Sequence, residues 1–392
     1  MNKIYILHLG NYLLKPDTGV AQKTFAMAEA MRHMGRDVFL VAISDLPVPA
    51  DLPPFLTVRP SPRSGYVEEA ERFFASLHHT DRVLFRYPFA SAGLLRLVNR
   101  FGGQIIFEHN TIEQAEMLLM QQEHFSRQPW TLKWSYFRYA IQTRWLKSTV
   151  ESRLGPAILA KVLGGICVSE EIKRYEQGRY HKLKAVTIAN GADSTVWSGL
   201  VAAPLVEELV VTMLIGSEAI WHGYERLLAG LLAQTPTKRR IRIQLVGIDR
   251  PSKFSWPASN GHVVEWLGRK SKRDIQSILE GSHIAAGTLA LYRKAMHEAS
   301  PLKVRECLMM GLPMILGYFD TDVSSDARFN PFLFQVGNNE TPIDWVAVES
   351  WYEGLHRDAG HRKTIARLAN EVLSMSAKAS KYLEFIDHLS EH

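Results

Sequence analysis

Two carboxylates, Glu298 and Glu306, lie close together in the segment MHEASPLKVRECLMMGLPMILG, which covers residues 296–317. Carboxylate oxygens accept hydrogen bonds from ligand hydroxyls. Lys303 and Arg305 lie between the two glutamates and add positive charge for an anionic group. Hydroxyl acceptors beside a seat for phosphate suit a sugar nucleotide. An amphipathic helix with solvated charges gives the same spacing, and this alternative stays open.

A helix start lies between the two glutamates. Serine is favoured at the N-cap and proline at the first helical position, so Ser300 and Pro301 predict a helix over residues 301–310. Gly311 is the expected stop. A helix N-terminus offers unpaired backbone N–H groups, which suit a phosphate.

The elements before this segment alternate between strand and helix patterns. The length of 392 residues favours two domains, and strand–helix–strand repeats predict parallel sheets. In the first half we expect strands at 3–10, 36–44, 82–87, 103–109, 164–169 and 184–193, with helices at 19–35, 91–102 and 170–180.

The pattern loosens after the Asn-Gly pair at 190–191 and then restarts. We expect strands at 209–217, 241–247, 263–268, 283–289 and 312–318, helices at 224–234, 272–282 and 301–311, and a helical end over 361–392. The predicted domains are 1–198, 199–375 and a C-terminal helix, 376–392, that packs back on the first domain. The predicted fold class is α/β, with two Rossmann-like doubly wound domains facing a central cleft. Ligands bind such sheets beyond the carboxyl ends of the strands.

Bulk composition favours an anionic partner but does not name it. The formal charge is +6 and the pI is about 9.1, which suits nucleotides, phospholipid surfaces or nucleic acid. Cys167 and Cys307 have neither disulfide nor metal-ligand spacing, so we expect buried thiols in a reducing cytoplasm. Neither a signal peptide nor a spanning helix is expected.

Residues 127–147, RQPWTLKWSYFRYAIQTRWLK, interleave aromatic and basic side chains. Such a helix suits an anionic membrane surface. It equally suits a helix that packs its aromatics inward while its basic residues stay solvated. Stacking on nucleic acid is the third alternative, and we do not expect nucleic acid as a partner.

Several motifs in order resemble the family-4 glycosyltransferases, which are retaining enzymes with the GT-B fold. Glu298 to Glu306 resembles their E-x7-E motif, and SPLKVRECLMMGLPMI resembles the region around it. TIANGAD, LIGSEAIWHGYERLLAGL, QLVG, VEWLG and ICVSEEIKRY also follow the family's order. The resemblance covers most of the chain and is strongest over residues 164–317.

The resemblance implies a donor site in the C-terminal domain, an acceptor site in the N-terminal domain and no metal or other cofactor. Glu306 would hold the ribose hydroxyls and Glu298 would contact the donor sugar as a catalytic residue. The amides of Leu302 and Lys303 would approach the diphosphate. Other expected donor-side residues are Gly216, Ser217, His222, Gly268, Arg269 and Ser300.

The loop GSEAIWHG departs from the family pattern, which often has an arginine and a lysine there to neutralise the diphosphate. His222 stands at the lysine position. Loss of two cations weakens stabilisation of the leaving group. We expect Lys303 to compensate, with Arg293 and Lys294 as further candidates. Packing of His222 against the preceding tryptophan remains the structural alternative.

Two residues of the first half match positions of the family, one on the acceptor side and one near the transferred sugar. Gly19, in KPDTGVAQKTF, would allow close approach of the backbone to a ligand. An ordinary helix start capped by Asp17 or Thr18 is the alternative. His109, in IIFEHNT, matches a histidine near the transferred sugar and is the second expected catalytic residue. The alternative for His109 is a loop histidine without a role.

The resemblance therefore implies a retaining, metal-independent glycosyltransferase that moves a sugar from a nucleotide-sugar donor to a glycan or lipid-linked acceptor. The expected role is synthesis of surface polysaccharide or glycoconjugate, in the cytoplasm or at the inner face of the membrane. A catalytically silent partner subunit and a sugar-nucleotide epimerase of the same fold are the alternatives. The sequence names neither the base nor the sugar of the donor.

Overall fold

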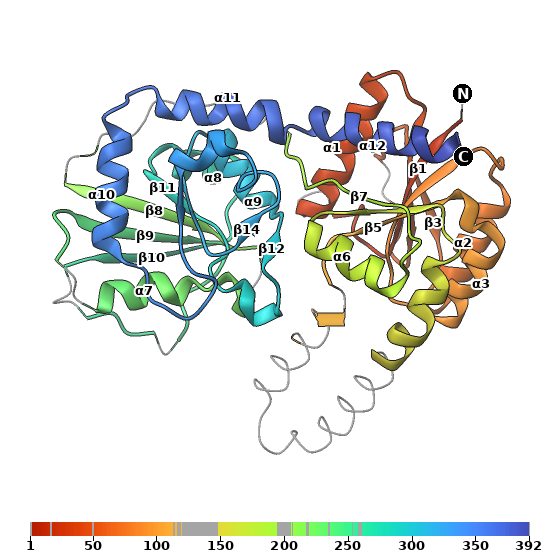
Figure 1. The fold of residues 1–392 in the computed structure, drawn as a ribbon, viewed down its shortest axis with the longest axis horizontal. Coiled ribbons are helices and arrows are strands. Elements are labelled where there is room, and N and C mark those ends of the chain that lie inside the picture. The colour runs from red at the N-terminus through yellow and green to blue at the C-terminus, as the bar shows by residue number, and fades with distance from the viewer. Residues whose placement is uncertain are drawn as a thin grey trace, which may run out of the picture. The chain divides into compact units, whose positions relative to one another are not determined.

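The chain forms two compact units, each built around a parallel sheet (Figure 1). Unit 1 comprises Met1–Ala189 and Met375–His392, and unit 2 comprises Asn190–Ser374. The computed structural model describes residues 2–15, 18–48, 51–112, 114–115, 119, 148–193, 205, 207–216, 219–233, 236–252, 254–257 and 261–391. The basic-aromatic segment 127–147 therefore lies outside the described residues.

Within the described residues, unit 1 contains a seven-stranded parallel sheet in the order β3-β2-β1-β4-β5-β6-β7. The order runs outward in both directions from β1 and β4, so the sheet is doubly wound. Its strands are β1 (Ile4–Leu9), β2 (Val38–Ser44), β3 (Leu56–Pro60), β4 (Arg82–Arg86), β5 (Ile105–His109), β6 (Gly164–Cys167) and β7 (Ala185–Thr187).

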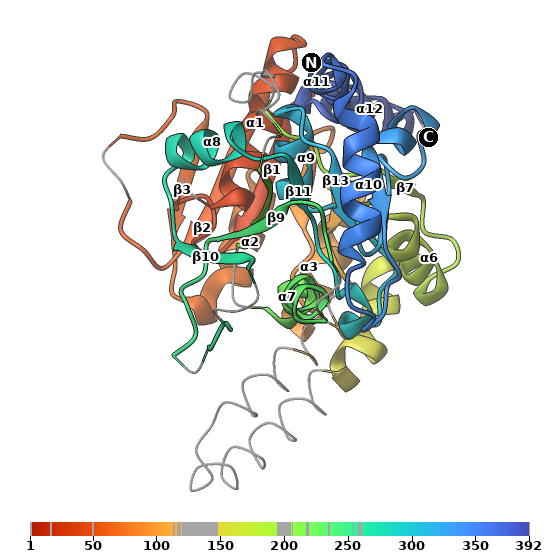
Figure 2. The same ribbon diagram turned by 90° about the vertical axis from the view of Figure 1, so that its left-hand side faces the viewer.

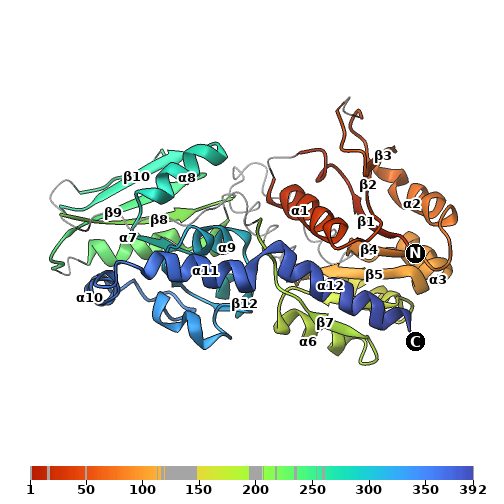
Figure 3. The same ribbon diagram turned by 90° about the horizontal axis from the view of Figure 1, so that it is seen from above.

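Helices cover both faces of this sheet. Its described helices are α1 (Gly19–His33), α2 (Tyr66–Ala75), α3 (Ala92–Phe101), residues 148–159, α6 (Glu170–Arg179) and α12 (Met375–Ser390). One apolar cluster joins the sheet to α1 and α12, which run next to each other (Figure 3). A second cluster joins the opposite face to α2, α3 and residues 148–159. Successive strand residues therefore contribute to different cores.

The described part of unit 2 contains a six-stranded sheet in the order β10-β9-β8-β11-β13-β15, also parallel. These strands are β8 (Glu208–Leu214), β9 (Arg240–Val246), β10 (Val263–Gly268), β11 (Ile284–Ala286), β13 (Met314–Leu316) and β15 (Leu333–Gln335). A separate two-stranded pair joins β12 (Glu298–Ala299) to β14 (Phe319–Asp320).

The described helices of unit 2 are α7 (Tyr224–Leu232), α8 (Lys272–Glu280), α9 (Leu302–Met309), α10 (Trp345–His356) and α11 (His361–Leu373). Helices α7 and α8 lie on opposite sides of β9 and β10 (Figure 1, Figure 2). Short 3-10 turns include η1 (Arg63–Gly65), η2 (Gly102–Gln104), η3 (Ile220–His222), η5 (Leu291–Lys294) and η6 (Ala327–Phe332).

The two parallel-sheet Rossmann-like units confirm the predicted α/β fold class. Cys167 and Cys307 are buried thiols, as expected. In the part of the chain that the structure describes, we find no helix that is both long enough and apolar enough to cross a bilayer. The end of the chain, expected to be helical over 361–392, forms two helices separated at Ser374, whose backbone is extended. Helices α2 and α10 and strand β3 were not expected.

Candidate functional site

The segment with the two glutamates forms strand β12, a short loop and helix α9. Glu298 pairs in register with Phe319 of β14 and is half-buried. Glu306 lies in the second turn of α9 and is 7% exposed. Oε2 of Glu306 forms an ion pair with Nζ of Lys303, at 3.2 Å, one helical turn earlier. The side chain of Lys303 is partly exposed. The lysine expected at the phosphate seat thus already pairs with Glu306.

The start of α9 differs from the prediction. Pro301 is the N-cap, with an extended backbone, and the helix begins at Leu302. Ser300 does not cap it, because its Oγ accepts a hydrogen bond from the N–H of Asn190 at 2.7 Å. Leu302 and Lys303 occupy the first turn, where N–H groups have no carbonyl four residues back in the helix. The N–H groups of these two residues are the ones that the sequence predicts to face a phosphate.

Arg305 does not point its charge at the helix start, which corrects the expectation from the sequence. Its side chain is fully buried and pairs through both terminal nitrogens with the carboxylate of Asp320. Its Nε donates to the carbonyl of Asn190 at 3.1 Å. A buried arginine requires such partners, since an unpaired charge in the interior is costly. Arg305 fixes the underside of α9 and is not available to a phosphate.

The loop after β8 is anchored by its backbone. Gly216 is exposed, and a Cβ added there would meet nothing within 4 Å. Ser217 lies outside the described residues. The carbonyl of His222 accepts from the N–H of Leu289 at 2.9 Å, just beyond β11. The half-buried ring of His222 lies 6.1 Å from that of Trp221, consistent with the structural alternative for this histidine.

The further cation candidates near this loop are engaged elsewhere. Arg293 forms ion pairs with Glu225 and Glu340. Lys294 is buried, and its Nζ lies 4.8 Å from the centre of the Trp221 ring. Both side chains hold the η3 and η5 turns together. Neither is placed as a spare positive charge for a diphosphate.

Two glycine turns meet at the ends of β9 and β10. The N–H of Gly247 donates to the carbonyl of Gly268 at 2.7 Å, and the N–H of Gly268 donates to Ile248 at 3.2 Å. Both glycines have positive φ, 104° and 62°, which disfavours other residues. Arg269 follows and is exposed. Of the expected donor-side residues, Gly216 and His222 lie on the loop after β8, Gly268 is the last residue of β10 and Arg269 follows it.

In unit 1, Gly19 is the first residue of α1. Thr18 is the N-cap, and its Oγ accepts from the N–H of Ala21 at 3.3 Å. This geometry is that of an ordinary helix start, the alternative left open for Gly19. Asp17 lies outside the described residues.

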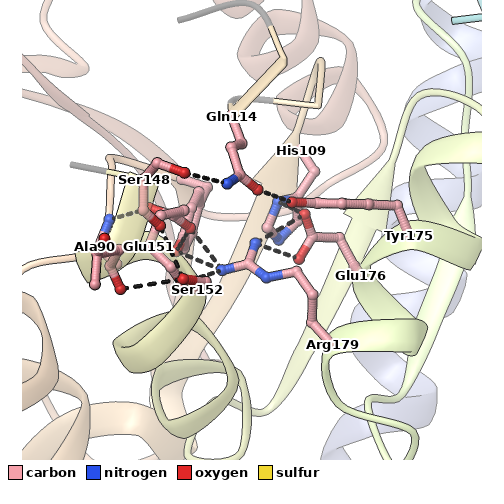
Figure 4. Close-up of polar contacts among 11 residues, drawn as sticks. Ala90, His109, Gln114, Ser148, Glu151, Ser152, Tyr175, Glu176 and Arg179 are labelled. Carbon is pink, nitrogen blue, oxygen red and sulfur yellow. Dashed lines mark hydrogen bonds and ion pairs between the residues drawn. The ribbon is translucent and has the colours of Figure 1, made fainter. Parts of the chain in front are cut away.

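His109 lies inside a buried polar network (Figure 4). Its side chain has no exposed surface, its ring stacks on Tyr87 at 4.8 Å, and its Nδ1 lies 3.4 Å from Oε1 of Glu176. Arg179 joins Glu176 to Glu151, at 2.9 and 2.6 Å. A ring enclosed in this way does not face a ligand, so the expected direct contact with a sugar is not supported by this geometry.

The preceding strand residue, Glu108, points to the opposite face and was not singled out from the sequence. It forms an ion pair with the buried Lys23 and accepts from Tyr382 Oη at 2.7 Å. Burial raises the pKa of Glu108. The nearby charges of Lys23 and Arg86 have the opposite and larger effect, so the pKa of Glu108 falls to about 2. The sequence carries one sign of this arrangement. Successive side chains of a strand point to opposite faces, so the glutamate and the histidine of IIFEH must face different cores.

The described residues contain no group of three or more His, Cys, Asp or Glu side chains placed to hold a metal ion.

No family model and no curated protein sequence matches this chain. Sucrose-phosphate synthase from Thermosynechococcus elongatus is similar in structure, with 14% identity, TM-score 0.66 and coverage of 99% of both chains. A glycosyltransferase from Rickettsia africae shares 14% identity, with TM-score 0.62, over 99% of this chain and 98% of that one. An α-glucosyltransferase solved with UDP and a 13-mer DNA shares 12% identity, with TM-score 0.57, over 99% and 100%. These likenesses establish the two-domain GT-B fold.

Proposed function

We propose that this chain is a glycosyltransferase that moves a sugar from a nucleotide-sugar donor to an acceptor hydroxyl. The observation that carries the proposal is the placement of Glu298 and Glu306 on either side of a free helix N-terminus. The solved glycosyltransferases of the same fold support it, because they match over nearly the full length. One of them was solved with UDP.

The donor would lie on the carboxyl edge of the unit 2 sheet. The first-turn amides of α9, at Leu302 and Lys303, would hold the diphosphate. Glu306 would accept hydrogen bonds from the ribose hydroxyls. When the ribose binds there, Lys303 would leave its 3.2 Å contact with Glu306 and turn towards the phosphates. Glu298 would contact the donor sugar. Gly216 would allow the diphosphate to approach the backbone, because nothing occupies the space beside it.

Retention of configuration is part of the proposal and rests on the sequence resemblance. The acceptor would attack from the face that the nucleotide leaves, and a donor phosphate oxygen would take the acceptor proton. No metal is required, because first-turn amides and Lys303 would stabilise the developing charge on the diphosphate. His109 would act indirectly, by supporting the end of β5, since its ring is buried.

We further propose a glycan or lipid-linked acceptor, a role in surface polysaccharide or glycoconjugate synthesis, and action at the inner face of the membrane through residues 127–147. These proposals rest on the resemblance and on the basic-aromatic pattern. Cosedimentation with anionic vesicles, compared between the intact chain and a chain with Lys133, Arg138 and Arg144 changed to glutamine, tests the membrane contact.

A catalytically silent subunit is the second candidate function. It is favoured by the engagement of Arg293 with Glu225 and Glu340 and by the burial of Arg305. These contacts leave few cations for a leaving diphosphate. A silent subunit would bind nucleotide weakly or not at all and would hydrolyse no donor.

The test is a thermal-shift panel of UDP, GDP, ADP, CMP and their sugar conjugates, in the presence of a chelator. A ligand at about 100 times its dissociation constant stabilises the folded state by about 2.7 kcal/mol. We expect one nucleotide to shift the wild type and not Glu306→Ala. Glu280→Ala, which removes an exposed glutamate from α8, is the matched control and should keep the shift.

The absence of any nucleotide shift in the wild type would favour the silent subunit. A nucleotide that shifts wild type and Glu306→Ala equally would contradict the proposed donor site. Donor turnover with and without acceptor separates transfer from epimerisation, and the anomeric configuration of the product, read by NMR, tests retention.

A further inference from the structure

Three side chains form a row across the carboxyl ends of β1, β4 and β5. Arg86 pairs in register with Glu108. His8 directly follows Leu7, whose partner Phe85 directly precedes Arg86. Alternation along the strands therefore places all three side chains on the face covered by α1 and α12. We call His8, Arg86 and Glu108 the Arg86 row.

The Arg86 row lies where the strand order of unit 1 reverses. Strand β2 follows β1 on one side, and β4 pairs with β1 on the other. In open α/β sheets, the crevice beyond the strand ends at this reversal is the usual place for a ligand. The row therefore occupies a position that the fold itself favours for binding.

The acidic member of the row is already satisfied. Oε1 of Glu108 forms an ion pair with Lys23 and accepts from Tyr382 Oη. Nζ of Lys23 also donates to Oδ1 of Asn110 at 3.1 Å. Glu108 thus neutralises Lys23, and the positive charge of Arg86 remains uncompensated within this group.

Arg86 is half-buried, yet within the described ranges its guanidinium makes no hydrogen bond and no ion pair. Its recorded contact is with the ring of Tyr12, 5.7 Å from the guanidinium carbon. Tyr12 is 48% exposed, on the loop that follows β1. A guanidinium has five N–H donors in a fork that matches an oxyanion. The donors of Arg86 are therefore left for water or for a ligand.

Two buried polar atoms also lack a partner in the described part of the chain: Nδ1 of His8, within the row, and Nδ2 of Asn110, which follows its last strand. Thr24 gives its one hydroxyl hydrogen to Val20 at 2.8 Å, so it accepts from Nε2 of His8 at 3.3 Å. Neutral His8 then presents Nδ1 as an acceptor, while Asn110 presents a donor. Buried polar atoms are normally paired, so both indicate a missing partner.

We propose that the Arg86 row binds an oxyanion, a phosphate or a carboxylate, carried by the acceptor substrate. Arg86 supplies the charged fork and Asn110 a second donor. Nδ1 of His8 accepts from an acceptor hydroxyl, and the exposed ring of Tyr12 packs against the acceptor's apolar surface. The proposal names the acceptor class of the proposed transferase and rests on that function for its biological meaning, although anion binding itself does not require it.

The test is isothermal titration of the intact chain with inorganic phosphate and, separately, with acetate. Arg86→Gln should weaken binding of the preferred anion by about tenfold or more, as expected for loss of charge-assisted hydrogen bonds. The matched control is Arg100→Gln, which removes an equal charge from the exposed end of α3 and should leave binding unchanged. Arg86→Lys should show an intermediate loss and serves if Arg86→Gln fails to fold.

Phosphate could also bind at the start of α9, so the experiment must distinguish that site from the Arg86 row. Lys303→Gln should leave the row's affinity intact. Equal affinity in Arg86→Gln and wild type would overturn the proposal, as would loss of binding in Lys303→Gln alone, or no saturable binding of either anion. The preferred anion then directs comparison of glucose 6-phosphate, glucuronate and glucose as ligands.

The nucleotide panel fails or succeeds independently of this titration, because it depends on Glu306 in the other unit. Anion binding through Arg86 without any nucleotide shift would refute the transferase and keep the row as an anion site. A nucleotide shift without anion binding would refute the row and keep the transferase.

Discussion

The backbone N–H of Asn190 donates a hydrogen bond to Oγ of Ser300 at 2.7 Å, although 110 positions separate them in the sequence. Nδ2 of Asn190 adds a bond to the carbonyl of Ser300 at 2.6 Å. Ser300 connects strand β12 to helix α9 and is buried. The residue that opens unit 2 therefore fixes the turn between Glu298 and the proposed phosphate seat.

This contact predicts that Asn190→Ala weakens nucleotide binding, although the side chain of Asn190 would not contact the nucleotide. The substitution leaves the buried carbonyl of Ser300 unpaired, which costs about 1–3 kcal/mol of folding stability. Loss of the turn's position should lower nucleotide affinity, measured by titration calorimetry at a temperature where the variant is folded.

Ser325→Ala is the control, because Ser325 is an exposed serine of the same unit. It should alter neither property. Wild-type nucleotide affinity in a destabilised Asn190→Ala would show that the contact serves stability alone.

The buried pair of Arg305 and Asp320 predicts a large stability effect. Asp320→Asn removes the nearer counter-charge of a fully buried guanidinium and leaves it only the carboxylate of Asp322, at 3.4 Å. Breaking a buried pair costs about 3–5 kcal/mol, so we expect a loss towards the lower end of this range. Urea unfolding followed by circular dichroism measures the loss. Arg328→Gln, which breaks an exposed pair with Asp326, should change the midpoint little. Similar midpoints for the two variants would contradict the structural role of Arg305.

The sequence predicted the alternation of strands and helices because buried parallel strands are apolar throughout and amphipathic helices have a clear period. It did not show that the two basic residues at the start of α9 have different roles. Lys303 and Arg305 look equivalent in sequence, and only the pairing of β12 with β14 brings Asp320 beneath Arg305. Long-range pairs of this kind leave no local signal.

The same limit applies in unit 1. The sequence resemblance pointed to His109, whereas Arg86, on the neighbouring strand, is the charged member of the Arg86 row that makes no ion pair within the described residues. Register between β4 and β5, which decides which residues share a face, is a property of the folded sheet. Alternation within IIFEH predicts that Glu108 and His109 diverge, but not which face carries Lys23.

Two glycines near the loop after β8 should respond differently to substitution by alanine. Gly223 has φ of 69°, and a Cβ there would lie 2.7 Å from that of Ala290, so Gly223→Ala should destabilise the fold by about 1–3 kcal/mol. Gly216 has open space beside it, so Gly216→Ala should leave the melting temperature unchanged.

Gly216→Ala should nevertheless weaken nucleotide binding if the diphosphate approaches the backbone there. Calorimetry with the nucleotide identified by the panel measures the effect. Unchanged affinity in Gly216→Ala would remove this residue from the donor site, while an unchanged melting temperature in Gly223→Ala would show that the loop tolerates a shift.

His8 predicts a pH dependence of stability. Burial, followed by the charge of Arg86, lowers the pKa of His8 to about 3, against the opposing effect of Glu108. Lys23 also faces the ring and lowers the pKa further. Because the unfolded chain binds the proton near pH 6.5, the contribution of His8 to stability is present above that pH and is lost as the pH falls towards 3. Glu108, whose pKa is about 2, adds a loss in the same direction only below about pH 4.5.

The window between pH 6 and pH 5 therefore separates the effect of His8 from that of Glu108, and comparison with a His8 variant removes the contribution of other histidines. Between these values the wild type should lose about 1 kcal/mol more of unfolding free energy than His8→Gln, which cannot titrate. Urea unfolding at each pH measures the difference, and His79→Gln, at an exposed position, should follow the wild type. Parallel losses in wild type and His8→Gln would mean that His8 is reached by solvent in the folded chain, and an acceptor held by its Nδ1 would then have to compete with water.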